Sequence, residues 1–180
     1  MDGALGTIDP LPAFFVENAL AELDEAEEWF FDSESSKLYF FHNATESTPP
    51  PEDWVFVVPD LARLVEVAGA SSESPVQDVR IQGLGLRDAS YTYMDAWGVP
   101  SGGDWALHRG GALFLERTQN VTISDCVFKR LDGNALMISG FNRATSVERN
   151  HFLWIGDCAM AAWGRTEEWD VLERRSNGVQ

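Results

Sequence analysis

Short apolar stretches alternate with polar residues between positions 79 and 163, and Asp, Gly and Asn separate them. This pattern predicts short β-strands joined by turns. The pattern also repeats. Ile123–Phe128 aligns with Val147–Phe152 and Gly133–Gly140 aligns with Asp157–Gly164, both at an offset of 24 (147 − 123 = 157 − 133 = 24).

The repeat continues toward the N-terminus with two changed offsets. Gly111–Leu115 aligns with Asn134–Ile138 at an offset of 23, and Val79–Ile81 aligns with Val121–Ile123 at an offset of 42. The longer offset indicates an insertion in the first repeat, predicted at 89–110. We interpret this insertion as a surface loop beside a groove, with a loop packed only for its own stability as the alternative.

Repeats of this length are typical of stacked coils, in which equivalent side chains form columns. The expected columns are Ile81, Ile123 and Val147; Leu86, Phe128 and Phe152; and Leu115, Ile138 and Ala162. A leucine-rich repeat has a similar period, but its Leu and Asn signature is missing. We therefore predict an all-β chain: a right-handed parallel β-helix, a single-stranded solenoid of about three coils, preceded by a β-rich segment.

Three regions are expected along the chain: a β-rich segment over 1–68, the coils over 69–164, and a polar tail, or the start of a continuation, over 165–180. The β-rich segment contains several predicted elements. These are strands at 13–16, 54–58 and 64–67, a turn or short helix at 19–27, and a hairpin joining 29–31 to 38–41.

Charge and composition narrow the classes of function. The 180 residues carry 13 basic and 29 acidic side chains, a formal charge of −16, which repels nucleic acid. No apolar run is long enough to span a membrane. Cys126 and Cys158 are expected to be two packed thiols rather than a disulfide, and the three histidines are too scattered for a metal site.

The N-terminal segment carries spaced motifs in a distinctive order: Glu17-Asn18, Glu28–Asp32, Lys37–Phe40 and Val76–Leu84. Together they resemble the opening of right-handed parallel β-helix proteins of the glycoside hydrolase type, in the pectate-lyase-like superfamily. Glu27 stands where that family usually has Gly. The resemblance implies a poly- or oligosaccharide partner and an extracellular or secretory location. Because members of the family are several times longer, we expect this chain to be a piece of a longer protein.

Glycoside hydrolysis needs two carboxyl groups, about 5 to 5.5 Å apart for retention and about 6.5 to 9.5 Å for inversion. Adjacent coils stack at about 4.8 Å, so acids at neighbouring positions of successive coils fall in this range. Asp132 and Asp157 meet this condition with a displacement of one residue (157 − 132 = 25, against a period of 24). We predict them as general acid and base or nucleophile; the alternative is that each caps a turn.

Residues near the insertion are candidates for binding the saccharide. His108 or Arg109 would contact a hydroxyl or an acidic substituent, and four aromatic side chains, Tyr91, Tyr93, Trp97 and Trp105, would stack on sugar rings. Asp125 is a second-rank acid, with a solvated position as the alternative.

Two other functions stay open. One is a non-catalytic carbohydrate-binding or structural β-helix module, or a truncated relic whose groove survives without chemistry. The other is a polysaccharide lyase, with Lys129, Arg130 or Arg149 as base. No cofactor or metal is predicted. Calcium at the acidic run 17–28 or in a lyase site is the alternative, without a convincing ligand spacing.

Overall fold

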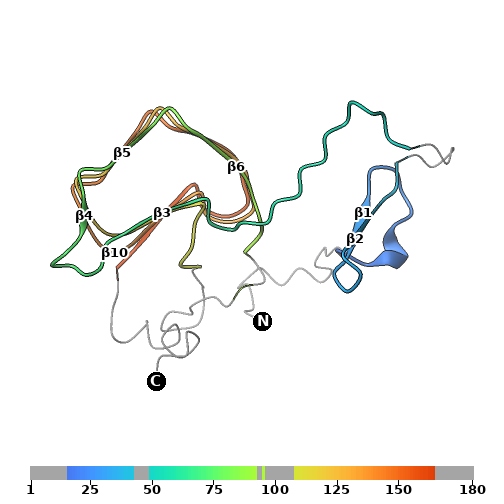
Figure 1. Ribbon diagram of the computed structural model, residues 1–180, viewed down its shortest axis with the longest axis horizontal. Coiled ribbons are helices and arrows are strands. Elements are labelled where there is room, and N and C mark those ends of the chain that lie inside the picture. The colour runs from blue at the N-terminus through green and yellow to red at the C-terminus, as the bar shows by residue number, and fades with distance from the viewer. Residues whose placement is uncertain (1–15, 43–48, 93–94, 96–107, 165–180) are drawn as a thin grey trace, which may run out of the picture. The chain divides into compact units, whose positions relative to one another are not determined.

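The computed structural model describes residues 16–42, 49–92, 95 and 108–164, and these residues are almost entirely β-structure and loops (Figure 1). They fall into two compact units, divided between Phe56 and Val57. Within the described residues the one helical element is a 3-10 turn, η1 (Leu20–Glu22), so no helix there is long and apolar enough to cross a membrane.

The first unit, here called the hairpin unit (residues 16–42 and 49–56), contains a two-stranded antiparallel sheet. Strands β1 (Trp29–Asp32) and β2 (Lys37–Phe40) pair with Trp29 opposite Phe40, which confirms the predicted hairpin. The 3-10 turn η1 lies within the range predicted as a turn or short helix.

Two motif residues hold the backbone of the hairpin unit. Asn18 accepts a hydrogen bond from the Phe31 N–H at 2.9 Å and donates one to the Phe31 carbonyl at 3.2 Å, so its side chain acts on β1 as a neighbouring strand would. The Glu28 carboxylate accepts bonds from the N–H groups of Asp24 and Glu25, both at 2.9 Å. Asn18 and Glu28 therefore have a local structural role.

The described residues of the second unit form eleven strands, and the part from 65 to 163 is here called the coil stack. Its strands are β3 (Val65–Ala68), β4 (Val76–Gln77), β5 (Arg80–Gln82), β6 (Gly85–Ala89), β7 (Leu113–Gln119), β8 (Thr122–Ser124), β9 (Val127–Leu131), β10 (Leu136–Arg143), β11 (Ser146–Glu148), β12 (His151–Ile155) and β13 (Met160–Trp163).

These strands form three parallel sheets that the chain enters in turn (Figure 1). Sheet 1 has the order β13-β10-β7-β3, with β4 also on β7; sheet 2 is β11-β8-β5, and sheet 3 is β12-β9-β6. Each strand pairs with the strand one coil away, so successive coils lie on one another.

The register confirms the columns predicted from the repeat. Ile123 pairs with Ile81 on one side and Val147 on the other, and Phe128 pairs with Leu86 and Phe152. The rings of Phe128 and Phe152 stack with centroids 4.8 Å apart. Leu115, Ile138 and Ala162 likewise pair across sheet 1.

Residues with a positive φ recur as strictly as the strands, at offsets of 42 and then 24 positions. At the bend between sheets 1 and 2 they are Asp78, Asn120 and Ala144, and at the bend between sheets 2 and 3 they are Gly83, Asp125 and Arg149. A third set, Asp88, Arg130 and Trp154, lies inside β6, β9 and β12. Eight of these nine positions carry a side chain, even though the left-handed region costs non-glycine residues energy.

Two predictions about local structure are wrong. Residues 54–58 form no strand; they are exposed, and no neighbouring strand pairs with them, so an apolar run alone was insufficient. Cys126 is buried as expected, but Cys158 is exposed, because no further coil among the described residues covers it. Most of the predicted strand at 13–16, most of the insertion 89–110 and the tail 165–180 lie outside the described residues.

Candidate functional site

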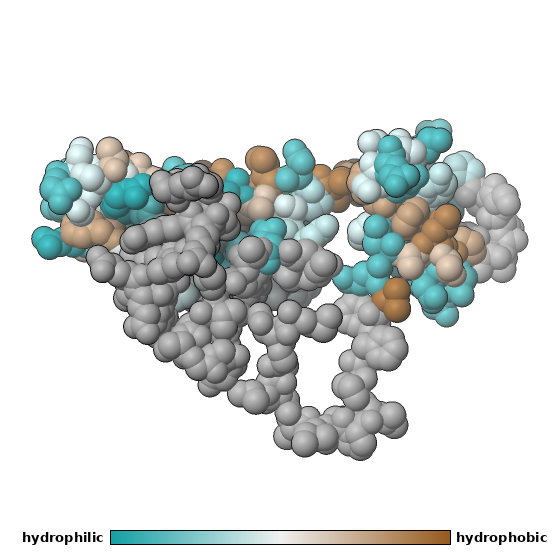
Figure 2. Space-filling view, turned by 90° about the horizontal axis from the view of Figure 1, so that it is seen from below, coloured by the Kyte–Doolittle hydropathy of each residue, from teal (hydrophilic) through white to brown (hydrophobic). Residues whose placement is uncertain are grey.

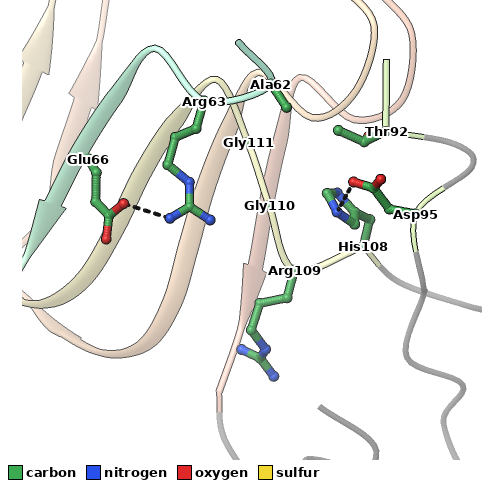
Figure 3. Close-up of a pocket in the computed structure, with 9 residues that line it drawn as sticks. All are labelled: Ala62, Arg63, Glu66, Thr92, Asp95, His108, Arg109, Gly110 and Gly111. Carbon is green, nitrogen blue, oxygen red and sulfur yellow. Dashed lines mark hydrogen bonds and ion pairs between the residues drawn. The ribbon is translucent and has the colours of Figure 1, made fainter. Parts of the chain in front are cut away.

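A cavity of about 370 Å³ opens where the chain enters sheet 1 (Figure 3). It is lined by three stretches that are far apart in sequence: residues 62, 63 and 66 at the start of β3, Thr92 and Asp95 after β6, and residues 108–111 before β7. The parallel pairing of β3 with β7 brings the first and third stretches together. Cavities of this size are typical of small-ligand sites.

Two acid–base pairs line this cavity. Arg63 Nη1 lies 2.7 Å from Glu66 Oε2, and His108 Nε2 lies 3.4 Å from Asp95 Oδ2. In Figure 3 the Arg63–Glu66 pair lies on one side of the Gly110–Gly111 backbone and the His108–Asp95 pair on the other. The two pairs place both hydrogen-bond donors and acceptors at the cavity wall.

The buried side-chain amide of Asn134 holds the backbone around His108. Asn134 is 2% exposed, and its Nδ2 donates to the carbonyls of His108 and Gly110, both at 3.0 Å. Its Oδ1 accepts from the N–H of Cys158 at 3.2 Å. A Cβ at Gly110 would lie 2.9 Å from His108 Nδ1, so a glycine is needed there for the imidazole to fold back over the chain.

Arg109 extends away from these two pairs toward β13 (Figure 3). Its guanidinium donates to Ser139 Oγ at 3.1 Å, to the Trp163 carbonyl at 3.0 Å and to the Gly164 carbonyl at 3.3 Å. It also lies over the Trp163 ring, 4.6 Å from the centroid. Arg109 therefore joins the cavity to the outer face of sheet 1.

The outer face of sheet 1 carries a buried carboxylate. Glu116 is 6% exposed; it accepts a hydrogen bond from Ser139 Oγ at 2.9 Å and lies 2.9 Å from Arg117 Nη1. Because Ser139 also accepts from Arg109, a continuous polar chain runs from Arg109 to Arg117. This chain fixes the orientation of the Arg109 guanidinium.

An apolar cluster lies beside this polar chain. Phe114, Met137 and Ala161 are buried, with Trp163 packed against them. Arg63 joins this cluster to the cavity, since its guanidinium carbon lies 4.0 Å from the centroid of the Phe114 ring. The cluster therefore packs behind the cavity wall and is not part of its lining.

The predicted catalytic acids lie at the bend after sheet 3 and do not line this cavity. Asp132 and Asp157 are both exposed. The register places Gly156 on Asp132 and Asp157 next to Gly133, where the Asp157 N–H donates to the Gly133 carbonyl at 3.3 Å. The two acids therefore lie on adjacent coils with the one-residue displacement that the repeat predicted. The Asp132 backbone carbonyl accepts from the Thr92 N–H at 3.0 Å, which connects this bend to the cavity.

The predicted saccharide-binding residues separate into three groups. His108 and Arg109 line the cavity, and Tyr91 is exposed next to the cavity residue Thr92. Three of the predicted aromatic residues lie outside the described residues, namely Tyr93, Trp97 and Trp105.

Asp125 has a surface role. It is exposed and lies 2.7 Å from Arg149 Nε, and it accepts a hydrogen bond from Gln82 at 2.9 Å. Hydrogen bonds from Arg149 and then Gln82 hold the pKa of Asp125 at about 2, below its usual value of 3.8. Arg149 and Asp125 are thus engaged with each other on a bend of the coil stack.

Three residues of the cavity were missed by the sequence prediction. Glu66 alternates with Val65 and Val67 along one strand, which is the signal for an outward-facing side chain. No local signal identified Arg63 as its partner. Asp95 lies within the predicted insertion, where no repeat constrains the position of a side chain.

Metal ligation finds no support in the part of the chain described: no group of three or more His, Cys, Asp or Glu side chains there is placed to hold a metal ion. No family model matches the chain, and no curated protein or solved structure is significantly similar to it.

Proposed function

We propose that the coil stack is a right-handed parallel β-helix of the glycoside hydrolase type and that the cavity at the entry to sheet 1 binds a poly- or oligosaccharide. The observation that carries the proposal is the cavity wall, in which Arg63 with Glu66 and His108 with Asp95 face one space. The parallel pairing of successive coils supports the β-helix, since crossovers between parallel strands are right-handed in nearly all proteins.

The chemistry of the wall favours a saccharide. Each sugar hydroxyl both donates and accepts a hydrogen bond, and each acid–base pair offers both functions side by side. Charged partners form stronger hydrogen bonds to hydroxyls than neutral ones.

Calorimetric titration with a panel of oligosaccharides tests this proposal. We expect His108→Ala to weaken the binding of any saccharide that the protein recognises by about tenfold or more, a loss of about 1.4 kcal/mol. His151→Ala is the matched control, because His151 is exposed on β12 in sheet 3 and lies outside the cavity lining. Equal losses in the two variants, or no binding to the panel, would contradict the proposed site.

Hydrolysis is the second candidate function, favoured because two carboxylates, Glu66 and Asp95, line one cavity and glycosidic cleavage uses a pair of carboxyl groups. The pair Asp132 and Asp157 is the other proposed catalytic pair. The release of reducing ends distinguishes them: loss of activity in Asp95→Asn and Glu66→Gln points to the cavity, and loss in Asp132→Asn and Asp157→Asn points to the bend.

A protein that binds saccharides without releasing reducing ends would be a non-catalytic binding module. An unsaturated sugar product, detected by its ultraviolet absorbance, would indicate a lyase instead. The same incubation therefore separates the three activities.

A further inference from the structure

The basic side chains of the cavity are already matched by acceptors of the protein. Arg63 lies 2.7 Å from the Glu66 carboxylate, and His108 lies 3.4 Å from the Asp95 carboxylate. Arg109 donates to one hydroxyl and two backbone carbonyls. A ligand that enters this cavity therefore meets basic side chains that already have partners.

The acids of the cavity stay accessible to a ligand in spite of this pairing. The side chain of Glu66 is 50% exposed and that of Asp95 is 56% exposed. Arg63 itself is 37% exposed, with its guanidinium over the Phe114 ring. The carboxylates of Glu66 and Asp95 are therefore at least as exposed to an entering ligand as the hydrogen-bond donors of Arg63 and His108.

From this arrangement, and resting on the proposed function, we infer that the cavity accepts uncharged saccharides and discriminates against polyuronates. A neutral hydroxyl can donate to Glu66 or Asp95 while accepting from Arg63 or His108, so it binds without separating either pair. A uronate carboxylate can only accept. It would have to compete with Glu66 for Arg63, or with Asp95 for His108, and would leave that acid without its partner.

The charge of the whole chain acts in the same direction. The formal charge of −16 creates an electrostatic field that repels polyanions. Polyuronates can bind acidic proteins through bridging calcium, which needs a group of several oxygen ligands. The described residues contain no such group of three or more titratable metal ligands.

Parallel titrations with neutral oligosaccharides and with oligogalacturonates of equal length test this inference. We expect the neutral ligands to bind at least tenfold more tightly, with an affinity that changes little between low and high salt. Addition of calcium should leave this order unchanged. Tighter binding of the oligogalacturonates, with or without calcium, would overturn the inference and leave the proposed saccharide site standing. Failure of both ligand classes to bind would overturn both.

A charge-removing variant tests the cause of the discrimination. Glu66→Gln keeps the shape of the side chain, removes its charge and frees the Arg63 guanidinium for a ligand carboxylate. We expect it to raise oligogalacturonate affinity relative to neutral ligands by about threefold or more. Glu148→Gln changes the net charge equally but lies on β11 in sheet 2, outside the cavity lining. Equal effects of the two variants would assign the discrimination to net charge alone and overturn the role of the Glu66 pair.

Discussion

The coil stack and the hairpin unit are both built from short strands, yet they differ in how much they bury. Inside the coil stack Leu113, Ile123 and Phe128 are fully buried. In the hairpin unit none of the described residues is buried, and Trp29 is 61% exposed. Figure 2 shows hydrophobic residues at the surface of the hairpin unit.

The difference follows from repetition. A strand of the coil stack has a neighbour one coil away, so each side chain in a column is covered by its equivalent. The hairpin has two strands, and two strands provide too little cover to be stable through burial alone. Hydrogen bonds of the Asn18 and Glu28 side chains to the backbone, and aromatic contacts such as Phe40 with Phe56, add to its stability.

Removal of one aromatic ring from each region gives the largest expected contrast. Phe128→Ala should lower the free energy of unfolding by about 3 to 5 kcal/mol, because the ring is fully buried and the stacked side chains cannot close the void that its removal leaves. Phe31→Ala, at a position 41% exposed, should cost about 1 kcal/mol or less. Urea denaturation measures both, and similar losses would contradict the comparison.

Both regions contain an asparagine whose side chain forms hydrogen bonds to the backbone of another segment. Substitutions at these two asparagines give a second matched pair of variants. Asn134→Ala leaves buried carbonyls of His108 and Gly110 without a donor, which should cost about 1 to 3 kcal/mol. Asn18→Ala should cost less, about 0.5 kcal/mol, since water can reach the exposed Phe31 backbone. Thermal unfolding measures the melting temperatures of both variants. A larger drop in melting temperature for Asn18→Ala than for Asn134→Ala would contradict this expectation.

Glycine substitutions at residues with a left-handed backbone conformation should stabilise the folded protein. Glu27 has a φ of 73° and Ala144 has a φ of 52°. A non-glycine residue in this region is disfavoured, so Glu27→Gly and Ala144→Gly should each raise stability by about 1 kcal/mol or less after the extra chain entropy of glycine. Urea denaturation measures both gains. A loss of stability in Glu27→Gly would mean that its side chain has a role that outweighs the backbone.

The smallest expected effects come from acid, which should lower the stability of both regions by protonating exposed carboxylates. The pKa of Asp125 is about 2 in the folded protein, against about 3.9 in an unfolded chain, so its pair with Arg149 stabilises the fold above about pH 4. This contribution is lost as the pH falls from about 4 to about 2. Asp125→Asn should therefore reduce the difference in melting temperature between pH 6 and pH 3.

The hairpin unit offers the matched acid. Hydrogen bonds from Ser35 lower the pKa of Asp32, whose carboxylate closes the hairpin turn. Asp32→Asn should likewise reduce the acid sensitivity of the hairpin unit, and a titration followed by NMR should find the pKa values of both acids below the usual range. Unshifted pKa values would show that neither pair forms in solution.

The repeat allowed most of the coil stack to be predicted, because stacking imposes one register on every column. The offset that aligned Ile123 with Val147 in the sequence is the offset at which these residues pair in sheet 2. The apolar run at 54–58 had no repeat partner, and the prediction of a strand there was wrong. A strand needs a neighbour as well as a suitable composition.

The candidate site was predicted only in part. His108 and Arg109 were identified because they precede a coil, and both line the cavity. Glu66 and Asp95 were missed. Arg63 and Glu66 are only three residues apart, but their place beside His108 depends on the pairing of β3 with β7, and the contact of Asp95 with His108 depends on the path of the chain after β6. Asp132 and Asp157 occupy the adjacent coils expected of them, at a bend apart from the cavity lining.

The sequence by itself determined the all-β class, the period of the coils and the residues that face the interior, because these follow from local alternation and from repetition. Only the tertiary structure decided which charged side chains meet. Arg63 with Glu66 and His108 with Asp95 share one cavity because three separate stretches of chain converge at the entry to sheet 1. Charged side chains on different stretches leave no periodic signal, so their meeting depends on the backbone that carries them.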